Sequence, residues 1–358
     1  MMICRVVLGA MLLLAACSAE ISENICREQA VGQPLCPELF LLGVQKSAST
    51  AFYYFLVDKA ALDIRVPKKL GRSPQLRKEP HYFNLLYEKG FEWYINGYGL
   101  RKSMDELAID ASPDYTAHPL SAERIKDSMN FERLRFIIIF REPVDRAYSW
   151  YRHCHSVGLK YPNYDTAFRS FDYKFSLMAK YTAEFVQHCV QMYSEPELVF
   201  PTCAHRSSHL LYEKYSAPVE ETGMNTTSFQ VIGMIFTEGL YGYIMSLWFH
   251  YFEPNQFCVL IYDNIVQDAR AELERIRPCL NFFGKEPVIG DDDVRLPKAN
   301  VKICENCPLY EELDEEAMGP VRRNLNERLY AKSNQLLRSL LKEHNLRDSI
   351  IEWENIYN

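Results

Sequence analysis

The sequence predicts a three-layer α/β domain with a central, mainly parallel β-sheet flanked by helices. Residues 39–56 and 135–149 both have the order buried strand, tight loop and helix. Strand candidates recur at 231–236 and 257–262, helix candidates at 240–252 and 266–282, and residues 311–353 have apolar residues at helical spacing. Strands that alternate with helices favour parallel pairing with helices on both faces, so we expect residues 311–353 to pack outside this core. With 358 residues, 48% of them hydrophobic, the chain can bury one large core.

The first strand-loop-helix unit has the features of an anion site. After the apolar run Leu39–Val44, the loop places Lys46 just before the expected helix. Such a junction directs backbone N–H groups and the positive end of the helix dipole at an anion. Hydroxyl donors come from Ser47, Ser49 and Thr50. The order is not that of G-x-x-x-x-G-K-[ST], because no second glycine accompanies the lysine; the alternative is a capped helix start without a ligand.

The second unit ends its strand, residues 135–140, with Arg141. Ligands of open α/β sheets bind at the carboxyl ends of the strands. Ser149 follows about two helical turns later, so the two side chains can hold one phosphate between them. In the alternative interpretation, Arg141 pairs with Glu142 or Asp145 and Ser149 lies on a solvated helix face.

Together with the segment Lys78–Phe83, these two units resemble the Golgi carbohydrate sulfotransferases. The resemblance rests on the K-S-x-S-T loop, the strand-R-x-P-x-x-R-A-Y-S-x-Y segment and K-E-P-H-Y-F, and it extends to Gly90–Tyr94, Asp110–Tyr115 and residues 238–262. It covers residues 38–285. Within that family the chain is most similar to the glycosaminoglycan branch, including the enzymes that 6-O-sulfate 4-sulfated N-acetylgalactosamine.

The resemblance implies the P-loop-like fold of sulfotransferases that use 3′-phosphoadenosine 5′-phosphosulfate (PAPS) as donor. The nucleotide product is then 3′,5′-diphosphoadenosine (PAP), and no metal is expected. It implies that Glu79 is the catalytic base and that Lys46 stabilises the leaving oxygen. His81 is a competing base or an orienting partner, with a structural histidine that has no direct role as the alternative. The implied donor contacts are Lys46, Ser47, Ala48, Ser49 and Thr50 at the 5′ end, and Arg141 and Ser149 at the 3′-phosphate.

One residue of the loop departs from the family pattern. Relatives usually carry glycine after the lysine, whereas this chain has Ala48. Alanine resists positive φ, so the loop either stays in a right-handed conformation or carries strain.

The implied acceptor is a glycan, in particular a polyanionic glycosaminoglycan such as chondroitin sulfate, and no nucleic-acid partner is expected. The net charge of −7 means that attraction to such a polymer has to come from local patches. The candidate basic stretch contains Arg65, Lys68, Lys69, Arg72, Arg77 and Lys78. The alternative is a solvated loop with no ligand.

The amino terminus indicates export. Arg5 precedes the apolar run 6–16, which is typical of a signal peptide over residues 1–19, with a short uncleaved signal anchor in the membrane as the alternative. Residues 14–17 also match a lipoprotein cleavage box, an interpretation that applies only to a bacterial protein. We expect a short lumenal lead-in at 20–37, a sulfotransferase domain at 38–358, and a protein of the Golgi lumen or membrane, or a secreted one. Asn225 begins an N-x-[ST] sequon for glycosylation.

Nine cysteines follow the leader, which predicts disulfides and at least one unpaired thiol. For Cys304 and Cys307 a structural disulfide is favoured over a zinc or redox site, since a zinc ribbon needs a second pair. The nine are Cys26, Cys36, Cys154, Cys189, Cys203, Cys258, Cys279, Cys304 and Cys307.

Three classes of function are compared. An active glycan O-sulfotransferase is favoured over a non-catalytic glycan-binding protein of the same fold, because Lys46, Glu79, Arg141 and Ser149 are all present. A nucleotide kinase is disfavoured by the missing G-K-[ST] and by the leader. Protein-tyrosine sulfation stays open, and the acceptor that takes up label decides it.

Overall fold

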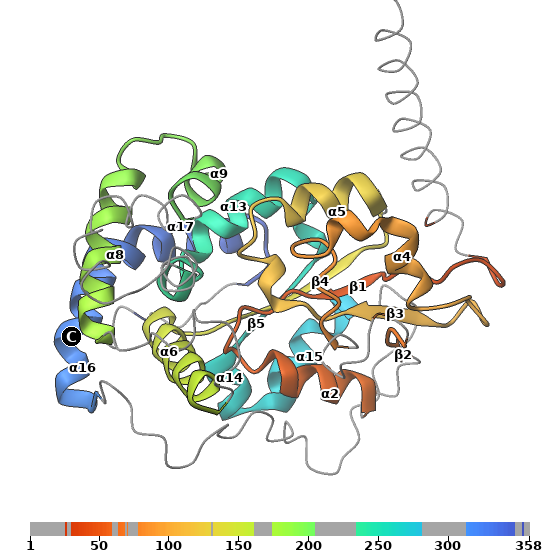
Figure 1. Cartoon of the computed structure of the whole chain (residues 1–358), viewed down its shortest axis with the longest axis horizontal. Helices are drawn as coiled ribbons and strands as arrows, with labels where there is room; N and C mark the ends of the chain where they lie inside the picture. The colour runs from red at the N-terminus through yellow and green to blue at the C-terminus, as the bar shows by residue number, and fades with distance from the viewer. Residues whose placement is uncertain are drawn as a thin grey trace, which may run out of the picture.

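The computed structural model describes residues 26, 30–58, 64–68, 70, 78–129, 132–160, 174–204, 234–280, 313–347 and 353. Its centre is a five-stranded sheet in the order β2-β3-β1-β4-β5, and every neighbouring pair is parallel (Figure 1). The strands are β1 (Leu39–Leu41), β2 (Ile64–Arg65), β3 (Leu107–Asp110), β4 (Arg135–Phe140) and β5 (Phe257–Ile261). The predicted α/β fold with a parallel sheet is confirmed.

Both faces of the central strands are buried, which explains why β1, β4 and β5 are largely apolar. In β4, Phe136 and Ile138 belong to one core, whereas Ile137 and Ile139 belong to the other. Successive side chains of a strand point to opposite faces, so a strand covered on both faces is apolar over most of its length. The whole of β4 is buried accordingly.

Helices cover the two faces (Figure 1). One face packs on α2 (Ser49–Asp58), α14 (Tyr262–Gln267) and α15 (Ala269–Leu280). The other packs on α4 (Phe91–Asn96), α5 (Ser121–Met129) and α13 (Tyr241–Tyr251). Helix α6 (Pro143–Lys160) follows β4 directly. These three layers place the loops after β1, β3, β4 and β5 at one edge of the sheet.

A further group of helices packs beside α13. They are α8 (Phe175–Val190), α9 (Pro196–Val199), η3 (Phe200–Ala204), α16 (Glu315–Leu325), η6 (Asn326–Tyr330) and α17 (Ala331–Glu343). Helix α17 packs against α13, and α16 packs against α8, as expected for the C-terminal helices. A side chain at Gly242 would collide with the backbone oxygen of Ser333, so glycine is required for the approach of α17 to α13.

Two expectations for secondary structure are wrong. Residues 234–237 form a helical turn instead of a strand, and the sheet contains β3 in its place. A short apolar run does not by itself distinguish a strand from a buried helix, and here Arg146 and Tyr330 hold the carbonyls of Ile235 and Phe236. The expected helix 266–282 is split into α14 and α15 at Asp268, which has extended backbone.

Three disulfides are present in the described part of the chain: Cys26–Cys36, Cys189–Cys203 and Cys258–Cys279. Cys154 is a buried free thiol. The prediction of disulfides together with an unpaired thiol is confirmed, while Cys304 and Cys307 lie outside the described residues.

The leader at 1–19 and the sequon at Asn225 also lie outside the described residues. Within the part that is described, none of the helices combines the length and apolar character needed to cross a bilayer.

Candidate active site

The loop between β1 and α2 has an unusual backbone that is fixed from within. Gly43, Lys46 and Ala48 have positive φ angles of 46°, 69° and 66°. Ser47 is fully buried; its hydroxyl donates to the Val44 carbonyl at 2.6 Å and accepts from the Val44 amide at 3.2 Å. The Ser47 hydroxyl therefore shapes the loop, and Ser49 and Thr50 open the helix that follows.

Of the two conformations expected for Ala48, right-handed or strained with a positive φ, the loop has the strained one. A left-handed conformation costs a residue with a Cβ about 1–2 kcal/mol. We therefore expect Ala48→Gly to raise the free energy of unfolding by about 0.5–1 kcal/mol, after the greater freedom of glycine in the unfolded chain is subtracted.

Chemical denaturation measures this effect. The matched control is Ala51→Gly in α2, where the backbone is right-handed and the same substitution lowers stability. If Ala48→Gly lowered stability as much as Ala51→Gly does, the inference that Ala48 is strained would be contradicted.

The second unit meets the first. The Arg141 guanidinium donates to the Lys46 carbonyl at 2.8 Å and lies over the Tyr262 ring at 4.4 Å. Ser149 lies half-buried on α6, two turns further on. The alternative pairing of Arg141 with Glu142 or Asp145 does not occur, because both carboxylates bind a different arginine.

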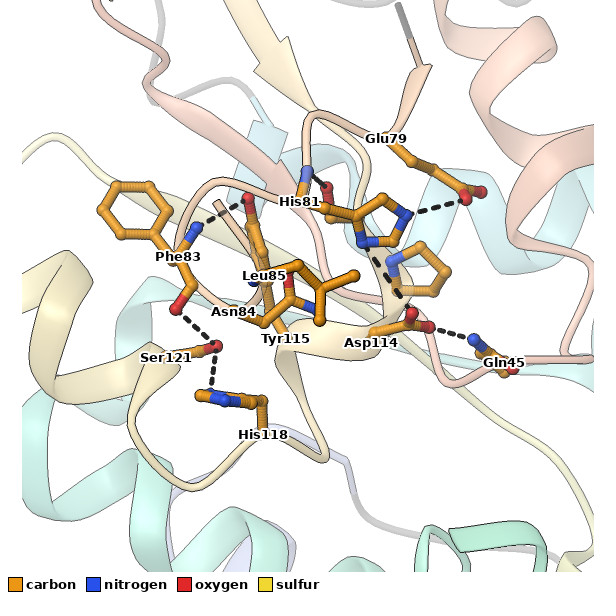
Figure 2. A network of polar contacts seen from close by, with 12 residues as sticks. Gln45, Glu79, His81, Phe83, Asn84, Leu85, Asp114, Tyr115, His118 and Ser121 are labelled. Atoms are coloured by element: carbon orange, nitrogen blue, oxygen red, sulfur yellow. Dashed lines mark hydrogen bonds and ion pairs between the residues drawn. The ribbon is translucent and has the colours of Figure 1, made fainter. Parts of the chain in front are cut away.

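The segment after Lys78 forms a chain of polar contacts that reaches the loop (Figure 2). Glu79 binds the Lys78 ammonium and lies 3.5 Å from Nε2 of His81. On its other side, Nδ1 of His81 lies 3.8 Å from Oδ2 of Asp114. Asp114 in turn accepts a hydrogen bond from the Gln45 amide, in the loop itself. The proposed base segment and the anion loop are thus joined through side chains.

The protonation states of Glu79 and His81 are determined by the neighbouring charged groups. Burial favours neutral Glu79, but the hydrogen bond from His81 and the charge of Lys78 outweigh it and lower the pKa of Glu79. Burial likewise opposes a charge on His81, yet Glu79 and Asp114 raise its pKa. Glu79 is therefore an ionised carboxylate at neutral pH, which is the state a general base needs.

His81 is held by the end of β3. Its backbone has φ 52°, and its amide donates to the Ser112 hydroxyl at 3.0 Å. That hydroxyl donates to Oδ1 of the buried Asp110 at 2.7 Å, and Oδ2 accepts from the phenols of Tyr94 and Tyr115 at 2.7 and 2.9 Å. None of these supporting residues was predicted as a site residue, although the resemblance includes Asp110–Tyr115.

Backbone contacts fix the next residues of the same segment (Figure 2). The Phe83 amide donates to the Tyr115 phenol at 3.3 Å, and the Phe83 carbonyl accepts from Ser121 at 3.4 Å. Nδ1 of His118 lies 3.3 Å from the same Ser121 hydroxyl. The backbone of His81 and Phe83 is therefore positioned by residues that follow β3 and by α5.

Lys46 and Glu79 share a neighbour that sequence analysis missed. Burial lowers the pKa of Lys46 to about 8; the nearby Cys154 thiol opposes this and the Arg141 charge adds to it. His153 on α6 is affected by both groups: burial and the Lys46 charge lower its pKa to about 4, against the effect of Glu79. The only signal in the sequence is that Ser149 and His153, four residues apart, share a helix face.

The basic stretch proposed for the acceptor is described only in part. Arg65 binds Glu106 and the Leu100 carbonyl, and Lys78 binds Glu79, so both are engaged within the protein. Lys69, Arg72 and Arg77 lie outside the described residues. Among those described, no cluster of three or more His, Cys, Asp or Glu side chains is arranged to hold a metal ion.

The relatives that this chain resembles include heparan sulfate enzymes. It is 31% identical over 119 residues to bifunctional heparan sulfate N-deacetylase/N-sulfotransferase 4 of Mus musculus, a match covering 33% of this chain and 13% of that protein. It is 30% identical over 135 residues to bifunctional heparan sulfate N-deacetylase/N-sulfotransferase 3 of Homo sapiens, a match covering 36% of this chain and 15% of that protein. A membrane-associated sulfotransferase of Dictyostelium discoideum is 30% identical over 127 residues, 34% of this chain and 24% of that protein.

Two further comparisons cover most of the chain. A crystal structure of a sulfotransferase from Alicyclobacillus acidocaldarius superposes with a TM-score of 0.48 and 17% identity, over 89% of this chain and 99% of that one. The family model described as sulfotransferase domain matches residues 37–307, well over half of the 358 residues. The chain therefore belongs to the sulfotransferase domain family.

Proposed function

We propose that the protein transfers a sulfuryl group from PAPS to a glycan. The observation that carries this proposal is that two charged groups are connected to the loop that contains Lys46. The Arg141 guanidinium binds the Lys46 carbonyl, and the Glu79 carboxylate is joined to the loop through His81, Asp114 and Gln45. This arrangement offers one charged group for each end of the nucleotide and a base opposite them.

Each residue then has a defined task. The loop amides and the Lys46 ammonium bind the 5′-phosphosulfate, and Arg141 with Ser149 binds the 3′-phosphate. The donor supplies an activated sulfuryl group whose leaving group is a phosphate. Glu79 takes the proton of the attacking acceptor group, and Lys46 stabilises the charge that develops on the departing oxygen.

The class of acceptor is the finer part of the proposal. We favour a polyanionic glycosaminoglycan. Two such polymers are candidates. The resemblance of the motifs favours chondroitin sulfate, whereas the matched relatives are named as heparan sulfate enzymes. The matched stretch is about a third of this chain, so the names support a glycan without selecting one.

Incubation with radiolabelled PAPS tests both the sulfuryl transfer and the class of acceptor. The acceptors are chondroitin, dermatan sulfate, N-desulfated heparan sulfate and a tyrosine peptide, each followed by disaccharide or peptide analysis. We expect label in one of the glycans and none in the peptide. Label only in the peptide would overturn the glycan proposal in favour of tyrosine sulfation, and no transfer at all with intact binding of PAP would favour a non-catalytic glycan-binding protein.

We further propose that the protein works in the secretory pathway, within the Golgi or beyond it. The three disulfides support this, because such bonds persist in oxidising compartments. Protease protection of the full-length protein in isolated Golgi vesicles tests it, and digestion without detergent would contradict it.

Binding of the donor product should draw a proton onto Lys46. With a pKa of about 8, the free ammonium is roughly half deprotonated at pH 8, and an adjacent phosphate favours the charged form. We expect an uptake of about half a proton per PAP bound at pH 8, measured by calorimetry in buffers of different ionisation enthalpy. Lys46→Arg keeps its charge throughout this pH range, so it should show no such uptake; equal uptake in both proteins would contradict the assignment.

A further inference from the structure

Arg322 connects the C-terminal helices to the turn between β4 and α6. It lies on α16, a helix that begins at the capping residue Asp314. Its guanidinium forms an ion pair with Glu142 at 2.9 Å and a second one with Asp145. The side chains of Arg322 and Glu142 are only 12% and 2% exposed, so this pair is shielded from water, whereas the Asp145 side chain is 39% exposed.

Both carboxylates lie at the start of α6, close in sequence to Arg141. Glu142 directly follows Arg141, and its oxygens also accept the amides of Val144 and Asp145 at 2.9 and 2.6 Å, which caps α6. An anion is stabilised at this helix end by the same amides and dipole. Without the positive charge of Arg322, the negative charges of Glu142 and Asp145 would repel the anion and attract the Arg141 guanidinium more strongly.

Arg141 is the group that gains from this arrangement. Its contacts are the Lys46 carbonyl and the Tyr262 ring, and no ion pair joins it to a carboxylate among the described residues. Asp263 is a third carboxyl group within electrostatic reach of Arg141, but its pKa is raised by burial. The two carboxylates nearest in sequence, which are the natural competitors, are held by Arg322 instead.

We infer that Arg322 is a positioning residue of the donor site, which neutralises Glu142 and Asp145 and thereby keeps Arg141 available for the 3′-phosphate. The inference rests on the proposed function, since it takes PAP as the ligand. It assigns no contact between Arg322 and the nucleotide. The effect of Arg322 should therefore depend on whether the nucleotide carries a 3′-phosphate.

Calorimetry with two nucleotides separates this role from a structural one. The dissociation constants of PAP and of adenosine 5′-phosphate, which lacks the 3′-phosphate, are measured for wild type and for Arg322→Met. We expect PAP to bind about tenfold to a hundredfold more weakly to the variant and adenosine 5′-phosphate to bind within about twofold of wild type.

Companion variants test the charge mechanism. Arg323→Met removes the same charge from the exposed neighbouring position of α16 and should leave both constants unchanged. Arg322→Lys keeps a charge and should bind PAP within about threefold of wild type. Adding Asp145→Asn to Arg322→Met removes one competing carboxylate and should restore most of the lost affinity.

The outcomes distinguish the inference from the function on which it rests. If the two nucleotides weaken together, or if Asp145→Asn restores nothing in a variant with an unchanged melting temperature, Arg322 is a structural residue and the inference fails. If wild type binds PAP no more tightly than adenosine 5′-phosphate, the 3′-phosphate site and the proposed function fail instead. Should Arg322→Met not fold, Arg322→Gln is measured in the same series.

Discussion

Glu79→Gln is expected to lower the turnover number by about a thousandfold, because the amide cannot accept the proton of the attacking group. Glutamine keeps the shape of the side chain and an oxygen that can accept from the buried Lys78 ammonium, so the melting temperature should change little. Initial rates with labelled PAPS, together with calorimetric binding of PAP, measure the two effects separately.

The control for Glu79 is Glu88→Gln. Glu88 is an exposed glutamate in the short helix η1 (Tyr87–Lys89) of the same region, and its substitution should leave the rate unchanged. Binding of PAP should persist in Glu79→Gln within about twofold, because Glu79 is assigned to the acceptor side of the sulfur. A rate within threefold of wild type would remove Glu79 as the base and leave His81, its neighbour, as the alternative.

Lys46→Met is expected to lower the turnover number by about a hundredfold to a thousandfold and to weaken PAP binding as well. Methionine keeps much of the aliphatic stem but supplies no charge to the leaving oxygen, and in a buried site that charge is only weakly replaced by water. Steady-state kinetics with varied PAPS separates the loss in rate from the loss in affinity.

Lys102→Met is the matched control, since Lys102 is exposed and lies after α4, away from the loop. The variant Lys46→Arg adds information, because it restores charge with a bulkier and planar group and should recover only part of the rate. If Lys46→Met lost affinity for PAP but kept the wild-type turnover number, Lys46 would bind the donor without stabilising the transition state.

The parts of the site that could be predicted from sequence are those defined by local order. Each strand-loop-helix unit is formed by residues that are consecutive in the sequence. The positions of Lys46 and Arg141 at the carboxyl edge of a parallel sheet could therefore be predicted. Strand β3 was missed because it has only four residues, Leu107–Asp110, and its short apolar run is ended by a charged side chain. With it, the supporting residues Asp110 and Asp114 were missed.

Long-range contacts account for the other failures. The helical turn at 234–237 is fixed by Arg146 and Tyr330, which lie 89 and 94 residues away from the carbonyls they bind. The alternative pairing of Arg141 with Asp145 looked reasonable from spacing alone. It is prevented by Arg322, which is 177 residues beyond Asp145, and nothing in the local sequence indicates that such a partner exists.

The distance along the chain between α16 and the turn that it neutralises has a consequence for biosynthesis. During translation, the β4–α6 turn leaves the ribosome 180 residues before the arginine that compensates Glu142. We expect a nascent or prematurely terminated polypeptide that lacks Arg322 to fold this turn without the compensating positive charge and to bind the nucleotide more weakly. Ribosome-stalled chains of increasing length, probed with immobilised PAP, would then be captured only once Arg322 has emerged.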